Sequence, residues 1–173
     1  MVTDQRVRGG DEFEIFARAR SQQLYRSAWL LCGNIHEAED LVQETLAKVY
    51  VRWRRRFGGQ IDNPAAYAQT VLVRAWIDTH RRRGSRERPV EAVPDEGVHD
   101  ADAELRLALR NALDALEPLD RAVLVRRYLD DAPVADVAAE LGISSGAVRN
   151  RSMRALERVR TGFGASLSDL RLP

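Results

Sequence analysis

The sequence predicts an all-α protein made of two small helical domains joined by a flexible linker. Apolar residues recur three and four positions apart through most of the 173 residues, and no segment alternates as a strand would. Glycine or Asn-Pro interrupts this period at a few places, where helices are expected to end or begin. The period disappears over residues 84–100, among prolines and charges, which indicates a linker.

The first helix is expected over residues 11–32, and Gly33 ends it. Its apolar side consists of Phe13, Phe16, Ala17, Leu24, Ala28 and Leu31. Asn34 and Glu37 then form an N-cap pair for the next helix, because the cap side chain and the N3 carboxylate can each bond a free backbone N–H group.

The second helix, about residues 35–56, has the most regular apolar stripe in the chain. The stripe consists of Ala38, Leu41, Val42, Thr45, Leu46, Val49, Tyr50 and Trp53. The opposite face carries Glu37, Asp40, Gln43 and Glu44. Charged helix faces are usually only solvated, so the residues alone leave open whether this polar face binds a partner.

The third helix begins at Asn63-Pro64, where a capping Asn precedes a proline at the first helical position, and it runs to about Arg83. Its inward residues are Ala68, Val71, Leu72, Ala75 and Trp76. Another face carries Tyr67, Arg74, Asp78 and Arg81. Together the three helices predict an N-terminal domain over residues 11–84.

Charge is strongly segregated along the chain, although the formal net charge is only +1. Residues 52–88 hold ten arginines and residues 149–160 hold five, whereas residues 90–104 hold six acids and neither Lys nor Arg. This pattern predicts two surfaces that face polyanions, joined by an acidic linker at residues 85–101 that does not.

A second helical domain is expected over residues 102–165. Its first helix places on one side Leu105, Ala108, Leu109, Ala112, Leu113 and Leu116. Pro118 opens the next helix, whose apolar residues are Leu119, Ala122, Val123 and Tyr128. We expect Asp130-Asp131 to end that helix and to cap the one that follows.

Residues 133–160 predict a helix-turn-helix that faces DNA. The apolar face of its first helix consists of Val134, Val137, Ala138 and Leu141. Gly142 supplies the left-handed residue of the turn, Ile143 enters the core, and Ser144 caps the second helix. That helix buries Ala147, Val148, Ala155, Leu156 and Val159.

The outer face of this second helix then consists of Ser145, Gly146, Arg149, Asn150, Met153 and Arg154. Small residues at its front let the helix approach bases closely, and Arg and Asn read guanine and adenine edges. The alternative is a helical hairpin that is packed for structure only.

No constellation in the sequence indicates catalysis, a cofactor or a metal site. His36, His80 and His99 are scattered, and Cys32 is the single cysteine, which we expect to act as a small buried hydrophobe. A glycine-rich phosphate loop and a nucleophile elbow are both missing. We therefore expect that the protein is not an enzyme.

The N-terminal segment lacks the apolar core of a signal peptide, and no run reaches membrane-spanning length, so we expect a cytoplasmic protein without membrane insertion.

Three segments, taken in order, resemble RNA polymerase sigma factors of the small, two-domain extracytoplasmic-function (ECF) type. They are AEDLVQETLAKVY (Ala38–Tyr50), NPAAYAQTVLVRAWIDTHRRR (Asn63–Arg83) and LDRAVLVRRYLDDAPVADVAAELGISSGAVRNRSMRALERVR (Leu119–Arg160). The resemblance covers about Asp11 to Phe163 and includes the acidic linker. It implies a sigma region 2-like domain, a sigma region 4-like domain, and a promoter-specificity subunit that directs transcription initiation.

In the first domain, the resemblance implies that core RNA polymerase docks on Asp40, Gln43 and Glu44. The third helix and the loop before it would recognise and melt the minus-ten promoter region. The implied DNA contacts are Tyr67, Arg74, Asp78, Arg81 and Arg82. The aromatic residues near enough to stack on a melted base are Trp53, Phe57, Tyr67 and Trp76, although both tryptophans fall on inward stripes.

In the second domain, the resemblance implies recognition of the minus-thirty-five region. Ser145, Arg149 and Asn150 would read bases, and Arg151 and Arg154 would hold phosphates. Ser144 and Gly146 would lie against the DNA at the front of the helix. The implied partners are core polymerase, promoter DNA and an anti-sigma factor. The residues alone leave a stand-alone helix-turn-helix regulator as the alternative, which would bind DNA tightly without polymerase.

Overall fold

The computed structural model describes the backbone of residues 3–55, 61–83 and 101–169, with side chains for 11–55, 61–82, 105 and 107–163. Within these ranges every regular element is a helix, which confirms the all-α prediction. The chain divides into two compact units, Met1–Trp76 and Ile77–Pro173, and the division falls inside the helix Pro64–Arg83. Residues 85–100 of the predicted linker lie outside the described residues, and its last residue, Ala101, instead begins helix α4 (Ala101–Asp114).

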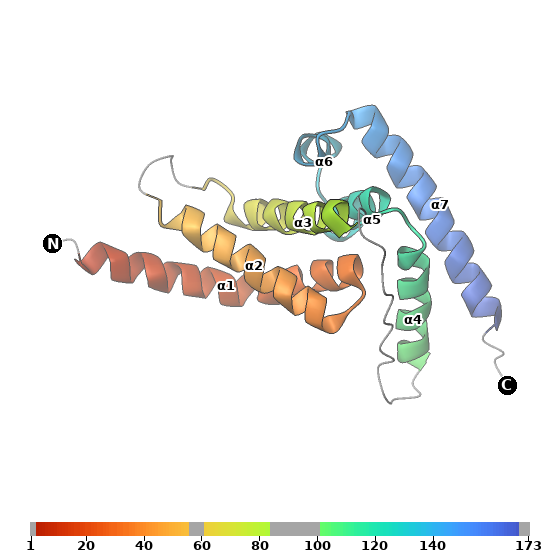
Figure 1. The fold of residues 1–173 in the computed structure, drawn as a ribbon, viewed down its shortest axis with the longest axis horizontal. Coiled ribbons are helices and arrows are strands. Elements are labelled where there is room, and N and C mark those ends of the chain that lie inside the picture. The colour runs from red at the N-terminus through yellow and green to blue at the C-terminus, as the bar shows by residue number, and fades with distance from the viewer. Residues whose placement is uncertain (1–2, 56–60, 84–100, 170–173) are drawn as a thin grey trace. The chain divides into compact units, whose positions relative to one another are not determined.

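The first unit begins with an antiparallel pair of helices, α1 (Thr3–Cys32) and α2 (Ile35–Trp53), which pack along each other (Figure 1). Gly33 has φ 69° and ends α1, as predicted. The Asn34 side chain accepts hydrogen bonds from the backbone N–H groups of His36 (2.8 Å) and Glu37 (3.2 Å), which confirms the predicted N-cap.

Two helix limits in this unit differ from the prediction. The backbone of α1 is helical from Thr3 rather than from residue 11, because the glycines at positions 9 and 10 weaken a helix without forbidding one. Helix α2 ends at Trp53, with Arg54 as its C-cap, three residues before the predicted end at residue 56.

Helix α3 (Pro64–Arg83) begins where Asn63 accepts a hydrogen bond from the Ala66 N–H at 3.0 Å, so the Asn-Pro start is confirmed. Gln69 of α3 donates to the Ser27 hydroxyl of α1 at 3.3 Å and joins the two helices at a buried position. The core of this unit contains Leu24, Ala28, Leu31, Ala38, Leu41, Val42, Val49, Ala68, Leu72 and Val73. Cys32 is half-buried, so it is less buried than predicted.

The second unit places its remaining helices against one long helix, α7 (Ser145–Asp169). The helices that contact α7 are α4 (Ala101–Asp114), α5 (Pro118–Leu124) and α6 (Val134–Leu141). Helix α5 continues into a wider π-helical turn, η1 (Val125–Leu129), before α6 begins. Helix α7 lies against α4 at Gly162, where an added Cβ would make an ordinary van der Waals contact, 3.5 Å from the Cβ of Ala112.

Three predictions about this unit are wrong. Leu105 is 45% exposed, because it lies near the start of α4, before Ala108, where the buried stripe begins. Tyr128 is 55% exposed, because the position that continues the stripe of Ala122 and Val123 is Arg126, which is only 4% exposed.

The third wrong prediction concerns Asp130-Asp131, which ends η1 but does not cap α6. The N-cap of α6 is Pro133, which makes no side-chain capping bond. Asp130 instead pairs with Arg126, and Asp131 adopts the left-handed conformation at φ 50°. The Asp130 carboxylate therefore pairs with Arg126 of the preceding segment η1 and does not cap α6.

Candidate nucleic-acid interface

The turn between α6 and α7 has the geometry of a helix-turn-helix. Gly142 has φ 66° and ψ 36°, and its N–H bonds the carbonyl of Ala138, so a left-handed glycine closes α6 as predicted. The Ile143 N–H also bonds the Ala138 carbonyl at 3.0 Å. The Ser144 hydroxyl accepts from the Ala147 N–H at 3.1 Å and caps α7. All three local predictions are confirmed.

A small apolar core holds the two helices together. Its buried members are Val123, Ala132, Val137, Ala138 and Val148, and the half-buried Val134, Leu141 and Ile143 pack against them. Because Val148 lies in the first turns of α7 and is fully buried, it determines which side of α7 faces inward.

The side of α7 opposite this core is exposed. Gly146, Arg149, Asn150 and Arg154 are exposed and Ser145 is half-buried, and all of them come from the first three turns. A Cβ added at Gly146 would meet only the Ser144 hydroxyl, at 3.8 Å, so the space in front of this turn is open. The predicted DNA-facing residues thus form one continuous surface, except Arg151.

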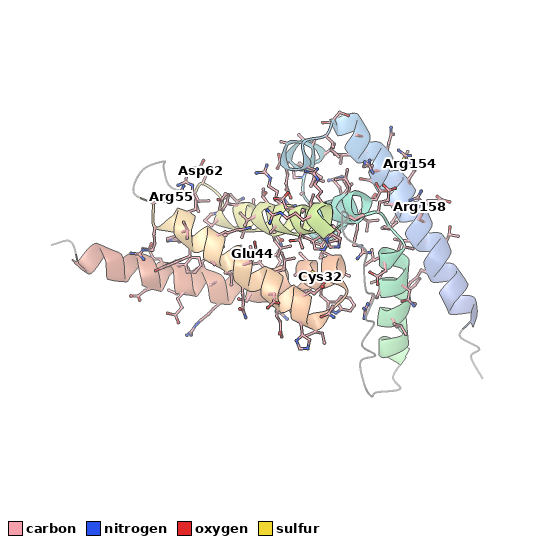
Figure 2. The ribbon with its side chains drawn as sticks, in the orientation of Figure 1. Cys32, Glu44, Arg55, Asp62, Arg154 and Arg158 are labelled. Carbon is pink, nitrogen blue, oxygen red and sulfur yellow. The ribbon has the colours of Figure 1, made fainter. Side chains whose placement is uncertain are left out.

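Arg151 lies on a different side of α7, against α5. Its Nη1 atom donates to the carboxylate of Asp120, and the Arg151 side chain is 30% exposed. Arg154, three residues further on, is exposed, and its Nε lies 3.4 Å from the carbonyl of Asn150 (Figure 2).

A buried ion cluster that sequence reasoning missed connects η1 to α6. Arg126 Nε lies 3.1 Å from both carboxylate oxygens of Glu140, and its Nη2 lies 3.0 Å from Oε2. Its Nη1 lies 3.0 Å from Asp130 Oδ2, and the three side chains are 5%, 3% and 1% exposed. Burial by itself would lower the pKa of Arg126, but the carboxylates of Glu140 and Asp130 outweigh it and raise that pKa above its usual value.

The sequence did contain a signal for this cluster. Arg126 continues the apolar stripe of Ala122, and Glu140 lies three residues after the buried Val137, so each charge interrupts an inward face. Opposite charges on two adjacent inward faces are what a buried ion pair requires. The cluster fixes α6 against the preceding helix and so supports the turn.

In the first unit, the polar face of α2 is exposed as predicted. Asp40, Gln43 and Glu44 all face solvent, and Glu44 forms an ion pair with Lys48 at 2.6 Å. These side chains lie opposite the residues that α2 buries against its neighbours.

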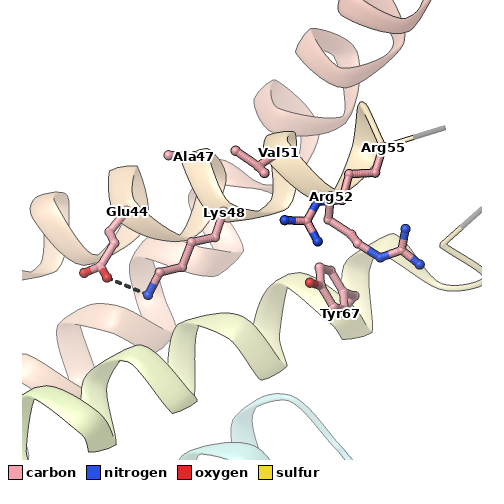
Figure 3. Close-up of a pocket in the computed structure, with 7 residues that line it drawn as sticks. All are labelled: Glu44, Ala47, Lys48, Val51, Arg52, Arg55 and Tyr67. Atoms are coloured by element: carbon pink, nitrogen blue, oxygen red, sulfur yellow. Dashed lines mark ion pairs between the residues drawn. The ribbon is translucent and has the colours of Figure 1, made fainter. Parts of the chain in front are cut away.

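A groove of about 420 Å³ lies beside that polar face (Figure 3). Residues of α2 line one side of it, and the Tyr67 ring of α3 lines the other. The α2 residues are Glu44, Ala47, Lys48, Val51 and Arg52, with Arg55 just beyond the helix end. Figure 3 shows the guanidinium groups of Arg52 and Arg55 extending from the α2 side toward the Tyr67 ring.

The groove therefore combines an aromatic ring with cations, which is the composition of sites that bind single-stranded nucleic acid. Sequence reasoning identified Tyr67 but missed Lys48, Arg52 and Arg55. Their spacing of four and three residues, which places cations on one side of a helix, was the available signal.

The other aromatic candidates are packed or not described. Trp76 is 2% exposed. Trp53 is half-buried, with its ring 5.6 Å from that of Phe13 and 5.3 Å from that of Phe16. Phe57 lies outside the described residues. Among these candidates with described side chains, Tyr67 is thus the one whose ring lines the groove.

The polar face of α3 is continuous along the helix. Tyr67 is half-buried, and Arg74, Asp78, Arg81 and Arg82 are exposed. The spacing of Tyr67, Arg74, Asp78 and Arg81 places these four on one side of α3.

Two features are absent from the described residues. These residues contain no group of three or more His, Cys, Asp or Glu side chains that could hold a metal ion. Among the same residues, no helix is both long and apolar enough to cross a bilayer.

Comparison with protein families matches both parts of the chain. The model of sigma-70 region 2 matches residues 16–86, and the model of sigma-70 region 4 matches residues 106–159. The RNA polymerase sigma-E factor of Streptomyces coelicolor is 33% identical over 162 residues, which cover 92% of this chain and 90% of that protein. The ECF RNA polymerase sigma factor SigL of Mycobacterium tuberculosis is 34% identical over 148 residues, covering 79% of this chain and 80% of that protein.

Solved structures share the fold. The sigma factor RpoE of Bartonella quintana, crystallised in complex with the anti-sigma factor NepR, matches with a TM-score of 0.62 at 22% identity, covering 90% of this chain and 96% of that chain. The extracytoplasmic function sigma factor SigJ of Mycobacterium tuberculosis matches with a TM-score of 0.59 at 27% identity, covering 84% of this chain and 52% of that chain.

Proposed function

The chain belongs to the ECF-type RNA polymerase sigma factors, and from this premise we propose which of its surfaces contact the promoter and which contact the polymerase. It is a promoter-specificity subunit of bacterial RNA polymerase that directs transcription initiation at a specific promoter class. A stand-alone regulator is not favoured, because region 2 and region 4 models both match in the expected order.

The domain limits that we propose are those that the sequence predicts. Residues 11–84 form the polymerase-docking and minus-ten domain, 85–101 an acidic linker, and 102–165 the minus-thirty-five domain. Two observations support the end of the first domain near residue 84: helix α3 runs without a break to Arg83, and the region 2 match ends at residue 86.

The exposed face of α7 reads the minus-thirty-five region. Arg149 and Asn150 reach base edges, Arg154 binds phosphate, and Ser144, Ser145 and Gly146 bring the helix end close to the duplex. The observation that carries this assignment is the open surface in front of a helix that Gly142 and Ser144 both position.

The groove of the first unit holds the melted minus-ten strand. A base stacks on the Tyr67 ring while Arg52 and Arg55 bind the backbone on either side. Along α3, Arg74, Arg81 and Arg82 contact phosphates, and Asp78 accepts hydrogen bonds from base amino groups. Stacking and charge together offset the cost of removing a base from the duplex.

The exposed stripe of Asp40, Gln43 and Glu44 docks on core polymerase. Its test is the Asp40→Lys/Glu44→Lys double variant, which should fail to co-purify with core polymerase while its thermal unfolding midpoint changes little, because all three side chains are exposed. Glu39→Lys, also on an exposed position of α2, is the matched control and should co-purify normally. Normal co-purification of the double variant would contradict the assignment.

The protein performs no chemistry of its own in this scheme, and an anti-sigma factor regulates it. The latter proposal draws on the related fold that was crystallised with an anti-sigma factor. Since core polymerase is the partner, we expect the protein to act in the cytoplasm.

Run-off transcription on fragmented genomic DNA tests the function as a whole. Core polymerase with the full chain should start transcription at a shared promoter motif, and core polymerase alone should not. The full chain alone should bind the same fragments weakly. Tight binding without polymerase, together with no initiation, would instead identify a stand-alone regulator.

A further inference from the structure

We propose that Arg151 positions the recognition helix α7 through Asp120 and does not bind DNA phosphate. The acidic first turn of α5 would then set the rotation at which α7 presents Arg149 and Asn150 to the bases. This inference rests on the proposed role of α7 in minus-thirty-five recognition.

The buried carboxylate of Asp120 lies close to two arginines of α7. Asp120 is 9% exposed at its side chain, and its Oδ1 accepts a hydrogen bond from Arg151 Nη1. Its Oδ2 lies 3.8 Å from Nη1 of Arg158, seven residues further along α7. Glu117 adds a second carboxylate, 3.9 Å from Arg151 Nη1.

The spacing of the two arginines makes this arrangement sensitive to helix rotation. Residues seven apart lie on the same side of a helix two turns apart, so Arg151 and Arg158 together define one line along α7. Arg149 lies about 200° around the helix from Arg151, given about 100° per residue. Holding Arg151 and Arg158 against α5 therefore turns Arg149 outward.

Desolvation keeps Arg151 with Asp120 when DNA arrives. Moving the guanidinium to a phosphate would leave a nearly buried carboxylate with only the more distant Arg158, and stranding a buried charge is costly. Arg154 faces no such cost, because its side chain is exposed and its guanidinium lies near a backbone carbonyl instead of a carboxylate. Phosphate binding at this end of α7 therefore falls to Arg154.

The substitution Asp120→Asn separates the two roles because they predict opposite results. If Arg151 bound phosphate, removing the carboxylate would release it, and promoter affinity and its salt dependence would both rise. If Arg151 is a positioning residue, the same change loosens α7, so promoter affinity falls while the salt dependence stays the same.

The experiment uses holoenzyme assembled from core polymerase and the full chain. The probe is the duplex that this holoenzyme selects from a randomised DNA library, and the dissociation constant is measured over a series of salt concentrations. Asp120→Asn and Arg151→Ala should each weaken binding about fivefold or more, with the slope of log K against log salt unchanged. Arg154→Ala, the matched control, should make that slope shallower by about 0.9.

Asp120→Glu keeps the carboxylate and should bind the promoter more tightly than Asp120→Asn does. A loss of packing alone would not explain that difference in affinity. Tighter binding by Asp120→Asn would overturn the proposal. So would a slope that becomes shallower by about 0.9 in Arg151→Ala. The slope of Arg151→Ala decides the question even if Asp120→Asn fails to fold. Arg149→Ala on the same probe tests the premise: if it changes nothing, the role of α7 in base recognition fails, and this inference fails with it.

Discussion

Replacing Glu140 with Gln should destabilise the second unit through the buried ion cluster. The change removes the negative charge opposite Arg126, whose Nε and Nη2 both bond Glu140 at 3.0–3.1 Å. Removing one partner of a buried ion pair costs about 3–5 kcal/mol. Because Asp130 still lies 3.0 Å from Arg126, we expect the lower end, about 3 kcal/mol.

The tryptophans of this chain make the measurement specific. Trp29, Trp53 and Trp76 are its three tryptophans, and all of them belong to the first unit. Tryptophan fluorescence therefore follows unfolding of the first unit, while far-UV circular dichroism follows the helices of both. Glu140→Gln should lower the midpoint of the dichroism transition by about 12 °C or more, given about 4–8 °C per kcal/mol for a small domain, and leave the fluorescence transition in place.

Glu157→Gln is the matched control, because Glu157 is an exposed residue of α7; its effect should stay within about 0.5 kcal/mol. The raised pKa of Arg126 means that its charge stabilises the fold at every pH below its usual pKa and is lost only in strong alkali. The deficit of Glu140→Gln should therefore be constant from neutral to mildly alkaline pH. A loss under about 1 kcal/mol would refute the reasoning that this cluster is dry and tightly paired.

Four other changes have expected outcomes. Gly142→Ala should destabilise the protein by about 1 kcal/mol in thermal unfolding, since φ 66° is unfavourable for alanine and nothing lies within 4 Å of the new Cβ to relieve or add to that cost. Gly146→Ala should keep or raise stability, yet weaken promoter binding in a gel-shift assay, because the added methyl group enters the space proposed for DNA. Arg149→Ala should cost about 1–3 kcal/mol and relax the preference at one promoter base in a binding-site selection; an equal loss on all sequences would indicate a phosphate contact. Tyr67→Leu should weaken binding to a single-stranded minus-ten oligonucleotide by about 1–3 kcal/mol, and unchanged binding would exclude stacking on this ring.

Local sequence signals predicted the elements that depend on local physics. Asn34, Asn63 and Ser144 cap their helices as expected, because a side-chain oxygen near a helix start finds free N–H groups whatever the rest of the fold does. Gly33 and Gly142 end helices with positive φ for the same kind of reason. The outward face of α7 was predictable because its apolar stripe is regular.

Charged residues at inward positions were where the sequence prediction failed. Arg126 was not predicted to be buried, and Tyr128 was predicted to face inward instead. An arginine is buried only where carboxylates lie beside it, and the apolar pattern does not show those carboxylates. Asp130 was expected to cap α6, yet it had a stronger partner on its own helix. The sequence also does not show that Asp120 lies beside Arg151, so it could not indicate the positioning role that we propose for this arginine.

The sequence by itself determined the course of the helices, the caps at Asn34, Asn63 and Ser144, and the side of α7 that faces outward, because each depends on residues within a few positions of one another. Only the tertiary structure decided which charged side chains pair with one another. Glu140 lies 14 residues from Arg126 in the sequence, and Asp120 lies 31 residues from Arg151. The groove joins α2 to Tyr67 of the next helix. A local pattern can show that a charge interrupts an inward face, but the cost of burying that charge depends on the neighbour that the fold brings beside it.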